Sequence, residues 1–585
     1  MGVERPFLSL LAAGAPEASP STERLKAAMF HGLGYETLVK TTGCEAMFIH
    51  AVPGLPAREV FIYRPYDKAT VWEQREVLSL ARRLGVRVFL WECMALQPDL
   101  VNLLQSQWMR DDCSTITNAY PDHEDVQGPT GFDVATAISE FVPLHGKLLT
   151  AEDQMLPVMK EHARLRGTTV GVVSARDAEL VSDDLLGRFG YPEHPKNVML
   201  AAAVGRAFGI STTVAICEMA DNVVPDLGVL KTYPTVPWSG RTLSFTNGMG
   251  ANDRAGTLAN WQRSGFGAHD PDHAPQRWIV TVVNNRADRV ARSEVFAKVL
   301  VQDVAAHRHV LIGTNVRGLL GFIQEALDSH LDAIALSRDL PTATDQRREV
   351  VSNRIDRAFA RLKVQRTDAQ SVLTECQALG FPPVDSALVQ RLLHPVPGES
   401  YEAASDAVRK AVAAECDDER LAFLVAAIAR RRIVRAVHAH AAESLEANPK
   451  AVDAAFRAAY RAFFLESVVP LHDADLSGDA IIDRIASAVP PGAQASVMGI
   501  QNIKGTGLDF VYRWVSIDMV HRMLNGLQSS ARDTREGALV QLLIHHDYGM
   551  IDATLASEAV GRARDLDPDA ATFPTMQPSS ACARS

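Results

Sequence analysis

The sequence lacks the features that mark several classes of protein. Its 585 residues include only seven cysteines, and no two of them form a Cys-x-x-Cys pair, so neither a disulfide framework nor a zinc site is expected. No apolar run approaches the roughly 20 residues that cross a bilayer. The net charge is −11, which leaves no basic excess for a nucleic-acid backbone. We therefore expect a cytoplasmic protein with no nucleic-acid partner, and docking at the inner face of the membrane stays open.

What the sequence does have is length and a regular alternation of patterns. A single core stops growing near about 250–300 residues, so several domains are expected. Between residues 20 and 320, helical patterns such as 21–32 and 71–84 alternate with short apolar runs at 86–92, 114–118, 168–174 and 277–283. This alternation predicts an α/β fold in which parallel strands are joined by crossover helices.

Polar side chains follow two of the predicted strands. Glu92 follows the run at 86–91, and Asn118, Asp122, His123 and Asp125 follow the run at 114–117. In a parallel sheet these positions lie at the ligand-binding edge, where Mg²⁺ takes one or two carboxylates and leaves its other positions to water and phosphate. Taken alone, Glu92 could cap a helix and the Asp-His pair could form a surface turn. Taken together, these residues favour a metal–phosphate site.

Three further clusters lie at predicted helix starts or strand ends. His194 and Asn197 lie at the start of a predicted helix of small residues, where their side chains could contact the edge of a purine base. Another cluster contains arginines at a strand-to-helix junction, where the planar guanidinium groups can each donate two hydrogen bonds to a polyphosphate. A salt-bridged helix start is an equally good interpretation of these arginines. The residues of the two remaining clusters are Asn247 and Asp253 in the first, and Arg286, Asp288 and Arg289 in the second.

Six segments, in this order, resemble the Mur ligase superfamily and most closely the poly-γ-glutamate synthase ligase of the CapB type. They are KTTG (40–43), WECMAL (91–96), ITNAYPDHEDVQGPT (116–130), EHPKNV (193–198), FTNGMGAND (245–253) and NNRADR (284–289). The resemblance implies a Mur-ligase-like ATPase domain at 1–225 and a smaller Rossmann-like ligase domain at 226–335. It also implies that ATP activates a carboxylate as an acyl phosphate, which an amino-acid amine then attacks to form an amide.

The resemblance also implies roles for single residues and for partners. The substrates would be glutamate, or another amino acid, and a growing γ-linked polymer, with membrane subunits of a synthesis complex as further partners. Glu92 and His123 would hold Mg²⁺, with Thr41 and Thr42 near metal and phosphate. The nucleotide-facing or substrate-facing positions would be Asn197 at the adenine, Lys231, Asn247 and Asp253 at the hinge, and Arg286, Asp288 and Arg289 on the ligase domain.

One family feature is missing from this sequence. The resemblance implies a G-T-x-G-K-[ST] loop whose backbone N–H groups and lysine hold phosphates, and this loop aligns with APEASPS at 15–21. That segment has no lysine, Glu17 brings a negative charge, and Pro16 and Pro20 remove N–H donors. Two hypotheses follow: a ligase that compensates with Lys26 or Lys40, or an inactive pseudo-ligase that serves as a scaffold or regulatory subunit.

The C-terminal half lies outside the resemblance. From 340 to 565 the sequence is rich in Ala, Arg and Glu with helical periodicity, which predicts an all-α domain, and we expect the tail at 566–585 to be disordered. An oligomerisation or docking role is the default for such a domain, so a homo-oligomer stays open. A glycine-rich turn at 499–507 contains Lys504 and could bind an anion, but a lone Gly-Thr-Gly is weak evidence.

Overall fold

The computed structural model divides the chain into two compact units. The first contains residues 1–231 and 250–253, and the second contains 232–249 and 254–585. The residues that the structure describes are 8–13, 21–42, 45–55, 57–64, 69–120, 124–334, 336–364, 367–547 and 557, with only the backbone described for 8–13, 21, 124–125 and 543–547. The predicted tail at 566–585 lies outside the described residues.

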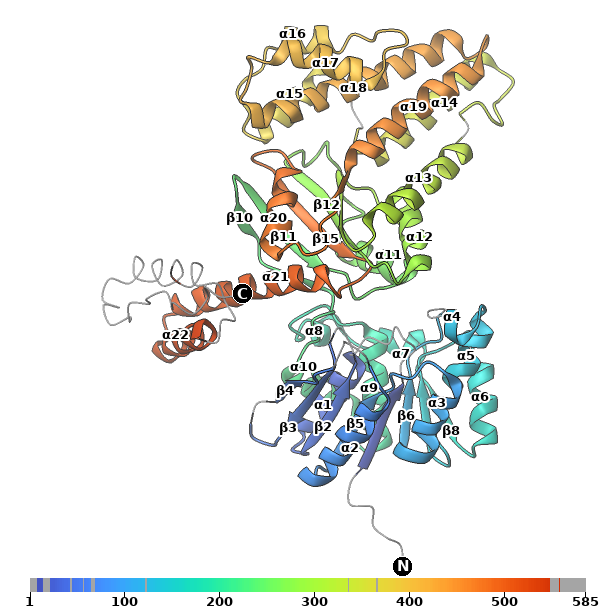
Figure 1. Cartoon of the computed structure of the whole chain (residues 1–585), viewed down its shortest axis with the longest axis vertical. Helices are drawn as coiled ribbons and strands as arrows, with labels where there is room; N and C mark the ends of the chain where they lie inside the picture. Colours follow the sequence, from blue (N-terminus) through green and yellow to red (C-terminus); the bar gives the residue numbers. More distant parts are fainter. Residues whose placement is uncertain are drawn as a thin grey trace, which may run out of the picture. The chain divides into compact units, whose positions relative to one another are not determined.

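The first unit is built on an eight-stranded sheet in the order β4-β3-β2-β5-β1-β6-β7-β8 (Figure 1). The six strands from β2 to β8 in this order run parallel, and β3 and β4 are antiparallel additions at one edge. The strands are β1 (Leu8–Ala13), β2 (Thr37–Thr41), β3 (Met47–Ala51), β4 (Arg58–Phe61), β5 (Val88–Glu92), β6 (Cys113–Ile116), β7 (Lys147–Thr150) and β8 (Thr169–Val172).

Helices connect these strands and cover the sheet, as crossover connections require. They are α1 (Ser21–Gly32), α2 (Trp72–Leu84), α3 (Pro98–Leu103), the π-helical turn η2 (Leu104–Met109), α4 (Glu124–Gln127), α5 (Gly131–Ser139), α6 (Leu156–Leu165), α7 (Ala175–Glu179), α8 (Asp183–Leu186), α9 (Pro195–Ala207) and α10 (Thr212–Asn222). The small side chains of α9 allow close packing: a Cβ added to Gly205 would lie 2.8 Å from Sδ of Met29 in α1. Residues 198–205 of α9 are all buried.

The second unit has a seven-stranded sheet in the order β10-β11-β15-β12-β13-β14, with β9 paired to β11. The strands β11, β15, β12, β13 and β14 run parallel, and β10 is antiparallel to β11. The strands are β9 (Lys231–Thr232), β10 (Val236–Trp238), β11 (Arg241–Asn247), β12 (Arg277–Asn285), β13 (Arg308–Gly313), β14 (Val468–Pro470) and β15 (Gln494–Ile500).

The helices of this unit fall into two sets (Figure 1). Those that accompany the sheet are α11 (Arg254–Arg263), α12 (Val290–Lys298), the π-helical turn η3 (Val299–Asp303), α13 (Val316–Ala333), α20 (Gly478–Ser487) and α21 (Thr506–Leu527), and α22 (Arg532–Asp547) packs on α21. Those inserted between β13 and β14 are α14 (Thr344–Arg361), α15 (Ala369–Ala378), α16 (Ser386–Leu392), α17 (Tyr401–Val412), α18 (Asp418–Ser444) and α19 (Pro449–Ser467). The inserted helices form their own layer, drawn in yellow to orange in Figure 1.

The expected separation of 340–565 as an all-α domain needs correction. The region is mainly helical, as predicted, but β14 and β15 return from it to the second sheet, and β15 lies between β11 and β12. Helix α21 then packs on that sheet, where Phe245 contacts Phe510 at 4.8 Å and Trp514 at 5.5 Å between ring centroids. A short strand buried on both faces shows no alternation, so periodicity alone does not distinguish it from a helical segment.

The predicted α/β class is confirmed, with parallel sheets in both units. Among the residues that the structure describes, no helix is both long enough and apolar enough to cross a membrane.

Candidate active site

The first polar cluster lies where parallel strands of the first sheet end. Thr41 closes β2 and Glu92 closes β5, and these two strands are neighbours in the sheet. The backbone N–H of Thr42 donates a 2.7 Å hydrogen bond to Oε2 of Glu92. The Thr41 hydroxyl is buried and has no hydrogen-bond partner among the described residues. The edge therefore presents a fixed carboxylate and an unsatisfied hydroxyl oxygen.

The electrostatics of Glu92 reflect burial opposed by nearby donors. Burial raises the pKa of the Glu92 carboxyl, while hydrogen bonds from Thr42 and the charge of Lys40 act in the opposite direction. A second buried carboxylate, Asp226, raises the pKa of Glu92 further. Asp226 is held by Arg24, whose Nη2 lies 3.2 Å from Oδ2. Sequence reasoning missed Asp226, because it follows no predicted strand.

A buried lysine lies behind this edge. Lys40 is fully buried in β2, and its Nζ lies 3.6 Å from Oε2 of Glu73 in α2. Arg64 donates to both oxygens of Glu73, at 2.8 and 2.9 Å. Burial lowers the pKa of Lys40 to about 8, although the carboxylates of Glu73 and Glu92 oppose this shift. Lys40 is therefore a cation close to Glu92 with little solvent around it.

The other lysine considered as a substitute, Lys26, is engaged elsewhere. It is completely buried in α1, forms an ion pair with Glu23, and donates a 3.1 Å hydrogen bond to Oγ1 of Thr115. Burial lowers the pKa of Lys26 as well. The charge of Lys40 acts on Glu92, whereas the partners of Lys26 are Glu23 and Thr115, so Lys26 is a weaker substitute for a loop lysine than Lys40.

The cluster after β6 is only partly described. Oδ1 of Asn118 accepts a 3.2 Å hydrogen bond from the Tyr120 N–H. Asp122, His123 and the loop at 14–20 lie outside the described residues, and Asp125 is described only as backbone in α4. Among the side chains that are described, no three His, Cys, Asp or Glu groups gather to hold a metal ion. The predicted pairing of Glu92 with His123 thus stays a prediction.

At α9, both predicted residues have local partners. His194 is the N-cap residue, and its Nδ1 accepts a 3.2 Å hydrogen bond from the Lys196 N–H. The Asn197 side chain lies 3.4 Å from Oε1 of Glu193, which also accepts from the His194 N–H at 2.8 Å. Helix capping therefore explains His194, and the adenine role of Asn197 stays a prediction.

A missed carboxylate organises the end of β7. Glu152 is buried, and its two oxygens accept hydrogen bonds from the backbone N–H groups of Ala119 at 2.7 Å, Gln154 at 2.8 Å and Met155 at 2.9 Å. Ala119 belongs to the loop after β6, so Glu152 fastens the loops after β6 and β7 to one another. A sequence signal existed, since Glu152 follows the apolar residues 148–149 just as Glu92 follows its strand.

The remaining predicted residues are divided between the units. Lys231 and Asp253 fall in the first unit, and Asn247 falls in the second with the NNRADR segment. Asn247 ends β11, is completely buried, and accepts a 3.2 Å hydrogen bond from the Met249 N–H. The hinge roles of these three residues stay predictions.

A network of side-chain amides occupies the end of β12 in the second unit. Oδ1 of Asn285 accepts from Ser293 Oγ at 2.7 Å and from Gln501 Nε2 at 2.9 Å. Nδ2 of Asn284 donates to the carbonyl oxygens of Asn502 at 2.9 Å and Lys504 at 2.8 Å. The network fixes the loop after β15 against the end of β12.

The arginines of NNRADR project beside this network. Arg286 donates to both oxygens of Asp288, at 3.0 and 2.7 Å, and Nε of Arg289 lies 3.8 Å from Asp288. Burial acts to raise the pKa of Asp288, but the hydrogen bonds and charge of Arg286 outweigh it and hold the pKa below its ordinary value. The structure thus brings Arg286, Asp288 and Arg289 together, as the sequence predicts.

The glycine-rich turn at 499–507 belongs to the same edge. It connects β15 to the 22-residue helix α21, and a Cβ added to Gly507 would lie 2.3 Å from Nδ2 of Asn284. Gly505 has a φ of 71° with a ψ of −137°, a conformation that strongly favours glycine. The weak sequence signal of Gly-Thr-Gly therefore marks a close approach between this loop and β12.

The architecture and these edges define a two-unit α/β protein with polar side chains at the ends of two parallel sheets. Residues 232–376 match the family model for the poly-gamma-glutamate synthase CapB C-terminal domain. The chain is 31% identical over 306 residues to PGA synthase CapB of Bacillus subtilis (strain 168), covering 52% of this chain and 74% of that protein. The chain belongs to the CapB family of poly-gamma-glutamate synthases.

The capsule biosynthesis protein CapB of Bacillus anthracis is 35% identical over 280 residues, covering 48% of this chain and 57% of that protein. Among solved structures, Escherichia coli FolC in complex with ADP has 14% identity and a TM-score of 0.38, covering 56% of this chain and 84% of that chain. A Thermotoga maritima folylpolyglutamate synthase has 13% identity and a TM-score of 0.36, with coverage of 56% and 83%. The family assignment depends on the sequence matches.

Proposed function

We propose that the chain is an ATP-dependent ligase that joins the amine of glutamate, or of another amino acid, to an activated carboxylate of a γ-linked polymer. The observation that carries this proposal is the buried Glu92 carboxylate at the strand-end edge, fixed by the Thr42 N–H. Family membership supports it, since both CapB relatives are named for polymer or capsule synthesis.

The residues at this edge fit a divalent ion with nucleotide phosphates. One oxygen of Glu92 is hydrogen-bonded by Thr42, and the Thr41 hydroxyl has no hydrogen-bond partner among the residues whose structure is described. A hard ion such as Mg²⁺ uses one or two such carboxylates and completes its shell with water and phosphate. Glu92 and His123 would hold the ion, and Thr41 would face it or a phosphate.

When bound, Mg-ATP supplies the phosphoryl group that converts the carboxylate to an acyl phosphate. The protein's own contribution to such a transfer is positioning and charge neutralisation. Lys40, buried near Glu92, supplies a positive charge, whereas the segment 15–21 contains no lysine. In the second unit, Arg286 and Arg289, which both interact with Asp288, have planar guanidinium groups that could donate hydrogen bonds to the carboxylate of the incoming amino acid.

A scaffold function is the second candidate, because the loop at 15–21 has Pro16, Glu17 and Pro20 and no lysine. In that case the chain would serve other subunits of a polymer-synthesis complex without turning over ATP. Equilibrium binding of Mg-ATP to the full chain distinguishes the two functions. Saturable binding supports the ligase, and undetectable binding at millimolar nucleotide leaves the scaffold.

A matched variant sharpens this test. Lys40→Met removes the proposed substitute charge, and Lys450→Met removes an exposed charge from α19. We expect Lys40→Met to weaken Mg-ATP binding by about tenfold or more, the value of a charge-assisted contact, and Lys450→Met to leave it unchanged. Equal affinity in all three proteins would refute the role of Lys40 without refuting the ligase.

A further inference from the structure

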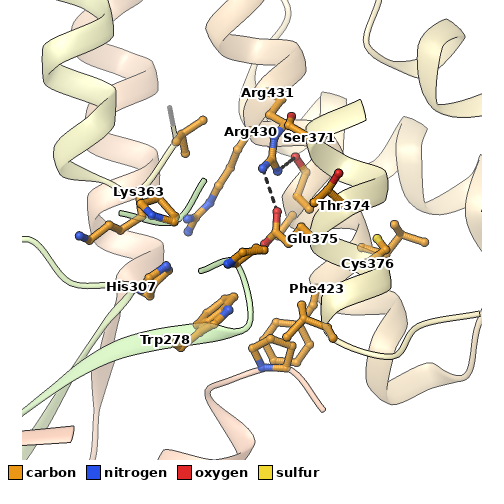
Figure 2. Close-up of a pocket in the computed structure, with 18 of the residues that line it drawn as sticks. Trp278, His307, Lys363, Ser371, Thr374, Glu375, Cys376, Phe423, Arg430 and Arg431 are labelled. Atoms are coloured by element: carbon orange, nitrogen blue, oxygen red, sulfur yellow. Dashed lines mark hydrogen bonds and ion pairs between the residues drawn. The ribbon is translucent and has the colours of Figure 1, made fainter. Parts of the chain in front are cut away.

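A cavity of about 120 Å³ lies within the second unit, away from the residues described above (Figure 2). Trp278, near the start of β12, and His307, just before β13, line it from the strand side. Ser371 and Thr374 of α15 and Phe423 of α18 line it from the helix side. The inserted helices therefore create a pocket against the amino ends of the strands.

One part of this cavity is apolar and rigid. The ring of Trp278 stacks on His307 at 4.7 Å and meets the edge of Phe423 at 6.0 Å. Leu379 and Phe381 complete this wall. An apolar cavity of about 150 Å³ takes up benzene, so the cavity has room for a group of about one aromatic ring.

Another part of the cavity is cationic. Within the described part of the chain, Nζ of Lys363 donates one hydrogen bond, to the His269 carbonyl at 3.2 Å. Arg308 donates there to the carbonyl oxygens of Ala488 and His307, each at 3.0 Å. Neither cation has a carboxylate within ion-pair distance among the described residues. Arg308 is buried and Lys363 is half-buried, and a cation with little access to water is costly unless an anion accompanies it.

The remaining cations and the histidine add to this polarity. Arg430 pairs with Glu466 at 2.7 Å, and Arg431 pairs with Glu375 at 2.8 Å, so these two are neutralised. Nδ1 of His307 accepts a 2.9 Å hydrogen bond from the Ile279 N–H. The neutral His307 ring therefore carries its proton on Nε2, where it can donate. Burial lowers the pKa of Lys363 to about 8, a cost that a bound anion would offset.

We propose that this pocket binds a small organic anion whose apolar body is about the size of one aromatic ring. Lys363, Arg308 and His307 would hold its carboxylate or phosphate group. Trp278 and Phe423 would contact its apolar body.

Such a ligand would act at a distance from the ligase chemistry. Trp278 precedes Asn285 by seven residues of the same strand, which at 3.3 Å per residue is about 23 Å. The ligand would therefore not compete with substrates at the NNRADR segment. By contacting β12, α15 and α18 together, it would stabilise the inserted helices against the sheet, whether or not the ligase reaction occurs.

The test uses the full chain and three probes built on one phenyl ring. Benzoate and phenyl phosphate carry the anion in its two forms, and benzamide is the neutral match for benzoate. Titration calorimetry and thermal unfolding should show that at least one anion binds at millimolar concentration or below and raises the Tm. We expect benzamide to bind at least about tenfold more weakly, since it lacks the charge-assisted contacts. Failure of both anions, or equal affinity for benzamide, would overturn the proposal.

Variants locate the bound probe. Lys363→Gln should weaken binding of the anion by about tenfold, and Lys450→Gln, on the exposed surface of α19, should not. Ala427→Met adds a side chain from α18 into the cavity and should abolish binding while thermal unfolding confirms the fold. Unchanged affinity in both Lys363→Gln and Ala427→Met would place the probe elsewhere and refute the assignment.

Discussion

The Thr42 N–H and the Glu92 carboxylate, 2.7 Å apart, join the loop after β2 to the end of β5. This hydrogen bond occupies one oxygen of Glu92 and fixes the rotamer of the side chain. A carboxylate with a fixed direction holds a ligand with less loss of side-chain entropy than a mobile one. The hydrogen bond between Thr42 and Glu92 is therefore a reason to regard Glu92 as part of a ligand-binding site.

Glu92→Gln should abolish amide formation while the fold persists. The amide keeps the size of the side chain, but it removes the negative charge proposed to hold the metal ion. We expect the rate to fall by about a hundredfold or more, as for other preorganised charge contacts. Because burial disfavours the charged carboxylate, the Tm should stay equal or rise. Product formation and thermal unfolding, with Glu76→Gln on α2 as control, are the measurements; a variant as active as the control would exclude Glu92 from the reaction.

Because Lys40 is buried, we expect the free energy of unfolding to rise with pH as this group titrates. Its folded-state pKa is about 8 against an ordinary 10.5. Below pH 8 both folded and unfolded chains hold the proton, so the cost of burying the ammonium is fully present; above 10.5 neither does, and the cost is gone. The free energy of unfolding should therefore rise between these values by up to about 3 kcal/mol from this group.

Urea unfolding at several pH values measures this effect, with Lys40→Met as the reference. Lys363, whose pKa is also lowered to about 8, contributes equally to both proteins and cancels in the difference. We expect the wild-type curve to rise more steeply than that of Lys40→Met between pH 8 and 10.5. Parallel curves would show that Lys40 titrates normally.

The parts of the fold that the sequence predicts are those with a clear local pattern. The strands at 88–92, 113–116, 169–172 and 277–285 and the helix at 21–32 were all expected, because short β-branched runs alternate with amphipathic helices. β15 was missed because it lies within a helix-rich region and is buried on both faces. The strand β1 was missed because its alanine-rich segment lacks β-branched residues.

The same contrast, between residues with a local sequence pattern and residues joined only by folding, holds for the candidate site. Arg286 and Asp288 could be predicted together, since only Ala287 separates them along one loop. Glu152 follows an apolar run and could have been found by the pattern that marked Glu92, whereas Asp226 depends on a contact that only folding creates and has no local pattern of its own. The contact between Gly507 and Asn284 joins positions 223 residues apart in the numbering of the chain, and no sequence spacing reveals it.

Gly507→Ala tests this contact. The new Cβ would lie 2.3 Å from Nδ2 of Asn284, which already bonds two carbonyl oxygens of the same loop. We expect a loss of about 1–3 kcal/mol in the free energy of unfolding, the range for overpacking. Gly321→Ala in α13 meets nothing within 4 Å and should stabilise by about 1 kcal/mol through helix propensity. Denaturant unfolding compares the two, and a stabilised Gly507→Ala would mean that the loop is free to move.

Arg286→Ala should raise the KM for the amino-acid substrate without weakening nucleotide binding. Arg286 is held in place by the hydrogen bonds that its Nε and Nη2 donate to Asp288, so its Nη1, which takes no part in that pair, has a fixed direction in which to receive a carboxylate. Loss of such a charge-assisted contact costs about 2–3 kcal/mol, or about a hundredfold in kcat/KM.

Two further variants separate positioning from charge. Arg286→Lys keeps the charge but not the planar fork, so it should recover only part of the loss. Arg317→Ala, an exposed arginine near the start of α13, should behave as wild type. If Arg286→Ala instead weakens Mg-ATP binding and leaves the amino-acid KM unchanged, the residue contacts nucleotide. In that case the amino-acid carboxylate must be bound by other donors, of which Arg289 is the nearest along the chain.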